Sequence, residues 1–277
     1  MTSIDIVRLC RIGIGKAETA LAGAAGRFLW FGPPVTEGLG IMSDCLGVLG
    51  GMGPAATADF LTKLVAMTPA ATDQEHLPVI AQSIPTIPDR SRAILGHGPS
   101  PLPALKAGLA RLRAAGCALA VMPCNSAHYW YDDLAGELPM LHIVDAVAAS
   151  LRRRGIEGGP IGLLATTGTI AAGIYQDRLA GTGFEIQVPT AEDQAELVEP
   201  AIRGIKAGAL DHAGTALRLA GARLRTRGIR ATVLGCTELP LVLASAPDAS
   251  HPLIDSTAAL AEACIAALRG PALPRAA

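Results

Sequence analysis

Two segments of the chain share one order of features: a short apolar run, then a cysteine, then residues that open a helix. Residues 118–123 (Ala-Leu-Ala-Val-Met-Pro) lead to Cys124, and residues 231–235 (Ala-Thr-Val-Leu-Gly) lead to Cys236. Such runs are typical of strands covered on both faces, so each cysteine is expected where a buried strand ends. A helix N-terminus beyond the cysteine would lower the pKa of the thiol. A single buried cysteine is more often a packing residue, but the repeat favours two facing acid–base groups.

From residue 45 onward, short apolar runs alternate with longer amphipathic stretches. The runs predict strands at 46–50, 78–83, 117–123, 141–144, 160–165, 184–188, 231–235 and 252–254. The stretches predict helices at 54–67, 102–115, 126–136, 146–154, 169–180, 191–207, 211–226 and 256–269. Strands and helices that alternate in this way indicate parallel sheets flanked by helices.

The two halves of the chain repeat the same landmarks. Gly50 lies 74 residues before Cys124, and Ala165 lies 71 residues before Cys236. We therefore predict an α/β fold of two pseudo-symmetric domains, each a mostly parallel sheet flanked by helices. The active site is expected in the interdomain cleft, because ligands bind beyond the carboxyl ends of parallel strands. The expected domains are 42–150 plus 255–277 and 151–254.

Composition narrows the class of protein. The 277 residues carry a net charge of −1, which gives no general electrostatic case for binding nucleic acid or an anionic membrane. The six cysteines show no CxxC pair, so a reducing cytoplasm is expected rather than a disulfide scaffold or a zinc site. Residues 1–41 lack the regular pattern. Either Met42 is the natural start and residues 1–41 are not native, or these residues form a loosely held, disordered extension.

Several loops carry further candidate residues. The glycine loop 50–54 would allow its backbone N–H groups to approach an anion closely. The loop also matches a dinucleotide-binding fingerprint, but the match is weak because no acidic residue ends the next strand. Arg90 follows two prolines, which favours a fixed guanidinium for a carboxylate, although an isolated arginine is more often solvated. Thr166 and Thr169 open a helix, as N-cap residues or as a carboxylate cradle. Lys206 lies near a helix end, where lysine is common.

Four more side chains are interpreted from their positions. His128 and Glu238 follow the two cysteines closely and could tune thiol protonation, and His128 could equally be a core or capping histidine. Asp145 and Asp255 lie at matching distances after the cysteines, and each is expected to cap a helix.

Taken together, the motifs resemble the aspartate/glutamate racemase family, and the aspartate racemase branch most of all. The residues that carry the resemblance are Gly51-Met52-Gly53-Pro54, Ile87-Pro88-Asp89-Arg90, residues 122–128 (Met-Pro-Cys-Asn-Ser-Ala-His), residues 164–169 (Leu-Ala-Thr-Thr-Gly-Thr), Lys206-Ala207-Gly208 and residues 234–240 (Leu-Gly-Cys-Thr-Glu-Leu-Pro). The resemblance covers residues 46–269. One departure is Ser126, where the family usually has threonine, so the hydroxyl is kept and a methyl group is lost.

The resemblance implies a racemase that uses Cys124 and Cys236 as its two bases and needs no pyridoxal phosphate or metal. It also implies a set of substrate-binding residues: Met52, Arg90, Asn125, Ser126, Thr166, Thr169, Lys206, Thr237 and Glu238. Arg90 and Lys206 would recognise the side-chain carboxylate, and the loop residues would hold the α-carboxylate and ammonium. A homodimer is plausible for the family.

The expected reaction is racemisation of an acidic amino acid, aspartate before glutamate. One rival keeps the fold and the cysteines but changes the reaction to that of a maleate isomerase, a decarboxylase or a hydantoin racemase. A second rival is a small-molecule or nucleotide-binding protein without catalysis. The sequence leaves substrate range and the resting thiolate open.

Overall fold

The structure is a computed structural model that describes residues 45–210, 212–243 and 251–269. The extension predicted at residues 1–41 lies outside the described residues. Among the described residues, no helix combines the length and hydropathy that crossing a bilayer requires.

Within the described ranges, seven strands form two sheets in which every pairing is parallel. The first sheet has the order β2-β1-β3 and the second the order β5-β4-β6-β7. The strands are β1 (Leu46–Gly50), β2 (Val79–Ser83), β3 (Leu119–Val121), β4 (Gly159–Leu164), β5 (Phe184–Gln187), β6 (Thr232–Leu234) and β7 (Leu253–Asp255). This arrangement confirms the predicted α/β class with two parallel sheets. The exact domain boundaries stay a prediction.

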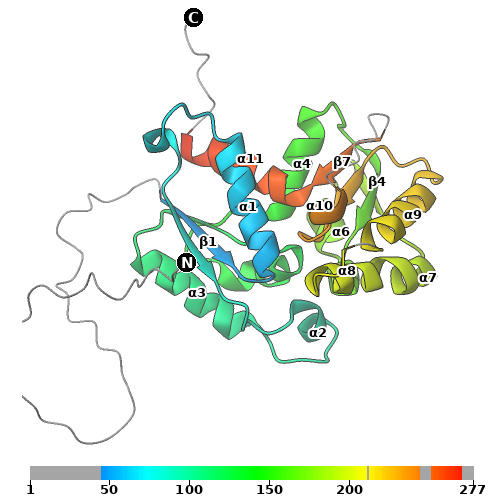
Figure 1. Ribbon diagram of the computed structural model, residues 1–277, viewed down its shortest axis with the longest axis horizontal. Coiled ribbons are helices and arrows are strands. Elements are labelled where there is room, and N and C mark those ends of the chain that lie inside the picture. The colour runs from blue at the N-terminus through cyan, green and yellow to red at the C-terminus, as the bar shows by residue number, and fades with distance from the viewer. Residues whose placement is uncertain (1–44, 211, 244–250, 270–277) are drawn as a thin grey trace, which may run out of the picture. The chain divides into compact units, whose positions relative to one another are not determined.

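Helices cover both sheets (Figure 1). The longer ones are α1 (Pro54–Met67), α3 (Leu102–Ala114), α4 (Ile143–Arg153), α8 (Glu199–Lys206), α9 (Ala213–Arg225) and α11 (Ser256–Arg269). The shorter ones are α2 (Arg90–Ile94), α5 (Thr167–Ala171), α6 (Ile174–Arg178), α7 (Ala191–Asp193) and α10 (Pro240–Leu243). Short 3-10 helices lie at Asp73–Glu75, Asn125–Trp130 and Asp132–Leu134, and a π-helix lies at Gln194–Val198.

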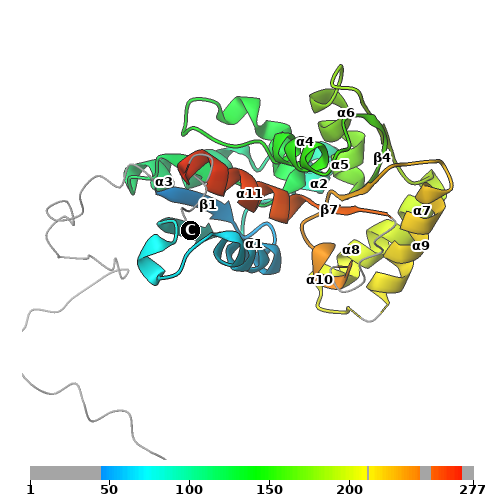
Figure 2. The same cartoon turned by 90° about the horizontal axis from the view of Figure 1, so that it is seen from above.

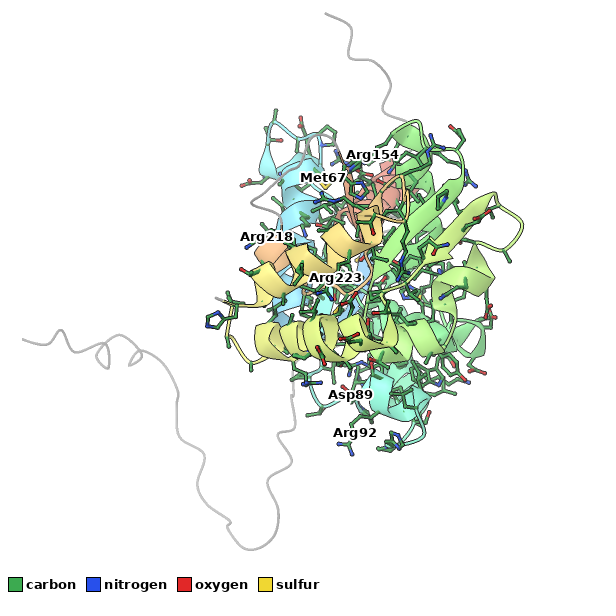
Figure 3. All side chains as sticks on the ribbon, turned by 90° about the vertical axis from the view of Figure 1, so that its right-hand side faces the viewer. Met67, Asp89, Arg92, Arg154, Arg218 and Arg223 are labelled. Carbon is green, nitrogen blue, oxygen red and sulfur yellow. The ribbon has the colours of Figure 1, made fainter. Side chains whose placement is uncertain are left out.

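One hydrophobic core is shared by the two sheets. It joins apolar side chains of β1, β4 and β6 with those of α1, α4 and α11, and α11 packs against both α1 and α4 (Figure 2). A second cluster lies between β1 and α3, and a third lies under α8 and α9. The α9 helix is also held by an ion pair between Arg223 and Asp193, and Figure 3 shows Arg223 on that helix. The shared core fixes the ends of β3 and β6 in one frame.

The structure corrects two elements that follow Cys124. The predicted strand at 141–144 is wrong: the chain makes one isolated parallel bridge, Ala120 to Met140, and α4 begins at Ile143. The cap of α4 is His142, whose Nδ1 accepts from the Val144 N–H at 3.1 Å, so the cap predicted for Asp145 is also wrong. An imidazole with a bare nitrogen can take the capping role that the sequence argument gave to a carboxylate.

Other predicted helices differ in their internal geometry. The helix expected at 126–136 consists of two 3-10 helices. The helix expected at 169–180 is interrupted at Gly173, whose φ of 63° is left-handed. The helix expected at 191–207 contains a π-helical turn, a feature common at functional sites. Asp255 caps α11 as predicted, because its Oδ1 accepts from the Thr257 and Ala258 N–H groups at 2.8 and 3.1 Å.

The contact between α2 and α5 leaves no room for a side chain at Gly168. A Cβ there would lie 2.6 Å from the Cα of Ser91. Gly168→Ala is therefore expected to lower the free energy of unfolding by about 1–3 kcal/mol. Gly221→Ala in α9 is the control, because the nearest neighbour of its new Cβ would lie 3.9 Å away. This substitution should raise the free energy of unfolding by about 0.5–1 kcal/mol, since alanine favours the helix over glycine. Urea denaturation measures both, and a Gly168→Ala protein as stable as the wild type would contradict the tight contact.

Candidate active site

The carboxyl ends of β3 and β6 open onto one small cavity that both cysteines line. Its walls are Met52, Cys124, Asn125, Ser126, Thr166, Thr169, Lys206, Gly235, Cys236, Thr237 and Glu238. Every residue that the sequence predicted for the site is therefore in the wall, with the exception of Arg90. Residues more than a hundred positions apart meet here because parallel strands of both sheets end at the same place.

The cavity is almost closed. Its volume is about 10 Å³, near the minimum that holds a single water molecule. Both thiols are 4% exposed. A wider pocket of about 480 Å³ adjoins it, lined among others by Arg90, and Lys206 and Glu238 line both spaces. The described residues contain no group of three or more His, Cys, Asp or Glu side chains placed to hold a metal ion.

Arg90 is buried, which overturns the interpretation as a solvated surface arginine. Its Nη1 donates to the carbonyl oxygens of Ile87 and Pro88 at 3.1 and 3.0 Å, and its Nη2 donates to that of Met52 at 3.2 Å. The Nε has no hydrogen-bond partner among the described residues. Arg90 thus fixes the loop that carries Met52 and presents one unused donor, but it lines the wider pocket rather than the cavity of the thiols.

Among the described residues no charged side chain hydrogen-bonds the Cys124 thiol, although the thiol lies close enough to Lys206 to interact with its charge. Its Sγ lies 3.6 Å from the Oγ of Ser126. His128 makes no described bond to the thiol: its Nδ1 pairs with the Cys124 carbonyl oxygen at 2.9 Å, and its Nε2 accepts from the Ile143 N–H at 3.2 Å. Burial lowers the pKa of His128 to about 4, which keeps the ring neutral at pH 7. Of the two interpretations of His128, the structure supports the buried histidine that holds backbone groups.

The surroundings of Cys236 are charged. Its thiol donates to Glu238 Oε2 at 3.0 Å, while Glu238 Oε1 has no partner among the described residues. Burial raises the pKa of Cys236 well above its usual range, the negative charge of Glu238 raises it further, and Lys206 opposes the shift. The lowered pKa expected from a helix N-terminus is therefore wrong for this thiol. Desolvation and an adjacent carboxylate outweigh the dipole of the short turn that follows β6.

The ammonium of Lys206 responds to the same charges. Burial lowers its pKa, but attraction to Cys236, Glu238 and Cys124 more than offsets this, so the pKa is raised. Lys206 is therefore held as a cation at the entrance that the cavity and the wider pocket share.

The loop of Thr166 and Thr169 is anchored from both sides. Thr166 Oγ1 accepts from the Thr169 N–H at 3.2 Å, which confirms the predicted N-cap. Ser91 of α2 donates to the same oxygen at 3.1 Å. Behind the loop, Glu199 accepts from the N–H and hydroxyl of Thr167 at 3.0 and 2.9 Å.

Sequence reasoning missed these anchors. Ser91 and Glu199 carry no motif of their own, and their distance along the chain from Thr166 gave no signal. The same holds for Tyr175 and Ser256, which hydrogen-bond the side chain of Asn125.

The comparison with known protein families agrees with a site of two buried thiols. Residues 49–264 match the family described as Asp/Glu/hydantoin racemase. The chain belongs to this family. Among solved structures of similar fold is Picrophilus torridus aspartate racemase, with a TM-score of 0.69 and 30% identity over 82% of this chain and 94% of that one. An aspartate racemase homologue from Pyrococcus horikoshii has a TM-score of 0.65 and 26% identity over 82% and 99%.

Curated relatives of this Asp/Glu/hydantoin racemase family member match over shorter segments. The broad specificity amino-acid racemase RacX of Bacillus subtilis is 30% identical over 147 residues, which is 51% of this chain and 63% of the relative. The glutamate racemase of Corynebacterium glutamicum is 30% identical over 181 residues, 60% of this chain and 64% of the relative. Each match thus spans less than two thirds of the relative's length.

The buried histidines predict that this racemase-family protein loses stability in mild acid. Burial lowers the pKa of His128 to about 4 and that of His142 to about 3, against about 6.5 in an unfolded chain. Between these values the unfolded state binds more protons, so the free energy of unfolding falls as pH drops from about 6.5 toward 4. The expected slope is about 1.4 kcal/mol per pH unit for each histidine.

Urea denaturation at a series of pH values measures this slope. His142→Asn keeps a capping side chain and removes one titrating group, so it should roughly halve the slope. A free energy of unfolding that stays constant from pH 6.5 to 4.5 would show that the two rings are not held neutral.

Proposed function

We propose that this protein racemises acidic amino acids, aspartate first and glutamate second, by a two-base mechanism with Cys124 and Cys236. The observation that carries the proposal is the closed cavity whose wall contains both thiols, several hydroxyl and amide donors, and Lys206. Membership of the racemase family supports it.

The two thiols supply all the proton transfer that racemisation needs. One sulfur, as thiolate, takes the α-proton from one face of the substrate and becomes a thiol. The other, as thiol, gives its proton to the opposite face and becomes a thiolate, so the α-carbon is inverted with no net change in protons. Neither a metal nor pyridoxal phosphate is required for this exchange, and we propose that the protein uses neither.

The intermediate between the two transfers is a carbanion, whose charge spreads onto the α-carboxylate. Donors fixed in a nearly dry cavity stabilise such charge strongly, because they need no reorientation during the reaction. Asn125, Ser126, Thr166 and Thr237 are the donors that we assign to the α-carboxylate and ammonium, together with the backbone at Met52. Thr169 supports this set through Thr166.

The two faces of the site differ at rest. Cys236 is protonated, and its S–H hydrogen-bonds to Glu238. It is therefore ready to act as the acid. A reaction that begins at Cys124 uses this state directly. The reverse reaction needs Cys236 as the thiolate and Cys124 as the thiol. We propose that, from the resting state, Cys236 passes its proton to Glu238 and Cys124 takes a proton from water before the substrate binds.

The cations select the substrate in this proposal. Lys206 and Arg90 would attract the side-chain carboxylate, and the unpartnered Oε1 of Glu238 would accept from the substrate ammonium. The substrate is a free amino acid in the cytoplasm, and a homodimer is the proposed assembly.

A racemisation assay tests the function directly. The purified protein should convert each enantiomer of aspartate toward the racemate, followed by chiral chromatography, and should place deuterium at the α-carbon in heavy water. Cys124→Ala and Cys236→Ala should each abolish racemisation, because the reaction needs a sulfur on each face. Cys264→Ala is the matched control, a buried cysteine of α11 outside the cavity. Full activity of either cavity variant would end the two-base mechanism.

Glu238→Gln tests the acceptor of the Cys236 proton. Without the negative charge the pKa of Cys236 should fall, since Glu238 is one of the causes that raise it. We also expect kcat in the direction that begins at Cys236 to fall by about 10²- to 10⁴-fold, the usual contribution of a general base. The pH dependence of alkylation, measured in a Cys124→Ala background, reports the thiol. Glu196→Gln, an exposed carboxylate of the π-helix, should change neither value, and an unaltered Glu238→Gln enzyme would refute the role.

A further inference from the structure

The side chain of Asn125 is held by two buried hydroxyls from other parts of the chain. Tyr175 Oη donates to Asn125 Oδ1 at 2.6 Å, and Asn125 Nδ2 donates to Ser256 Oγ at 3.0 Å. Ser256 Oγ in turn donates to the carbonyl oxygen of Leu234 at 2.8 Å. Asn125 is 2% exposed, and Tyr175 and Ser256 are fully buried.

The chain of bonds has one possible direction. The Leu234 carbonyl can only accept, so Ser256 must give it its single proton. The oxygen of Ser256 then has to accept from Asn125, which places the amide nitrogen on that side and the amide oxygen on the side of Tyr175. Burial raises the pKa of Tyr175, so its phenol stays a donor. An amide flip would place the Asn125 oxygen against the Ser256 oxygen, whose proton is already donated to Leu234, and the Asn125 NH2 group against the phenolic O–H of Tyr175. The flip is therefore excluded.

The same bonds connect the two cysteine loops. Asn125 follows Cys124 directly, and Leu234 lies two residues before Cys236. Tyr175 comes from α6 and Ser256 opens α11. The amide of Asn125 is thus oriented by elements outside its own loop, while its side chain lines the cavity.

We propose that Tyr175 and Ser256 are positioning residues, which lock the amide of Asn125 so that its second N–H is presented to the substrate α-carboxylate. This inference rests on the proposed racemase function. This second N–H of Asn125 has no partner among the described residues. It is the one donor that the oriented amide does not use within the protein. A free amide could rotate and turn its oxygen toward the carboxylate, where charge accumulates in the carbanion.

Tyr175→Phe removes the hydroxyl and keeps the ring. We expect kcat for aspartate racemisation to fall about tenfold to a hundredfold, with KM changed less than about threefold, because the lost orientation matters most when charge develops. Ser256→Ala should have the same effect and serves if Tyr175→Phe folds poorly. Tyr131→Phe is the matched control: it also removes one phenolic bond to a carbonyl, the 2.7 Å bond to Met140, outside the cavity. It should keep wild-type kinetics.

The decisive measurement is the double variant Tyr175→Phe/Asn125→Ala. If Tyr175 acts through Asn125, the double variant should be no slower than Asn125→Ala alone. If Tyr175 had a merely structural role, the kcat losses of the two single variants would multiply in the double variant, or Tyr175→Phe would lower the melting temperature without a specific loss of kcat. Either result overturns the inference. Wild-type kcat in Tyr175→Phe overturns it as well. A wild-type protein that racemises no acidic amino acid overturns the proposed function itself, and the inference with it.

Discussion

Desolvation of the two thiols is the constraint on which the rest of the site depends. A charge in a cavity this small is costly unless an opposite charge or a hydrogen bond balances it. Around Cys236 the balance consists of a shared proton, the carboxylate of Glu238 and the ammonium of Lys206. These groups interact so strongly that moving one proton changes the field at all of them. Cys236 hydrogen-bonds directly to this set, whereas Cys124 interacts with the Lys206 charge without a hydrogen bond to it.

The fold protects this arrangement with uncharged contacts. A core shared by both sheets holds the ends of β3 and β6 in one frame, and hydroxyl, amide and imidazole bonds then fix the loops that follow. His128 holds the Cys124 carbonyl, and Ser256 connects Asn125 to the end of β6. Neutral networks of this kind set geometry without adding a second buried charge to compete with the thiols.

The fold class and most residues of the cavity wall could be predicted from the sequence, because local patterns determine them. Strong local patterns mark α1, α11 and the two strands that end at the cysteines. Because ligand sites lie at the carboxyl ends of parallel strands, the motifs at those ends predict the wall of the cavity. Details set by tertiary contacts were not predictable. Asp145 looked like a cap, but His142 takes that role, and the sign of the Cys236 pKa shift depends on burial that no local pattern encodes. Tyr175 and Ser256 lie 50 and 131 residues from the side chain they orient.

The size of the cavity bears on how a substrate reaches the thiols. About 10 Å³ holds one water molecule and no amino acid, so binding must enlarge the space, and the wider pocket that shares Lys206 and Glu238 is the route on the described surface that adjoins it. The contact of Ser91 with Thr166 and Gly168 closes one wall by a hydrogen bond and close backbone packing. Neither interaction is strong alone. A wall closed by weak contacts can open for entry and close again to exclude water, which is what the proposed carbanion intermediate requires.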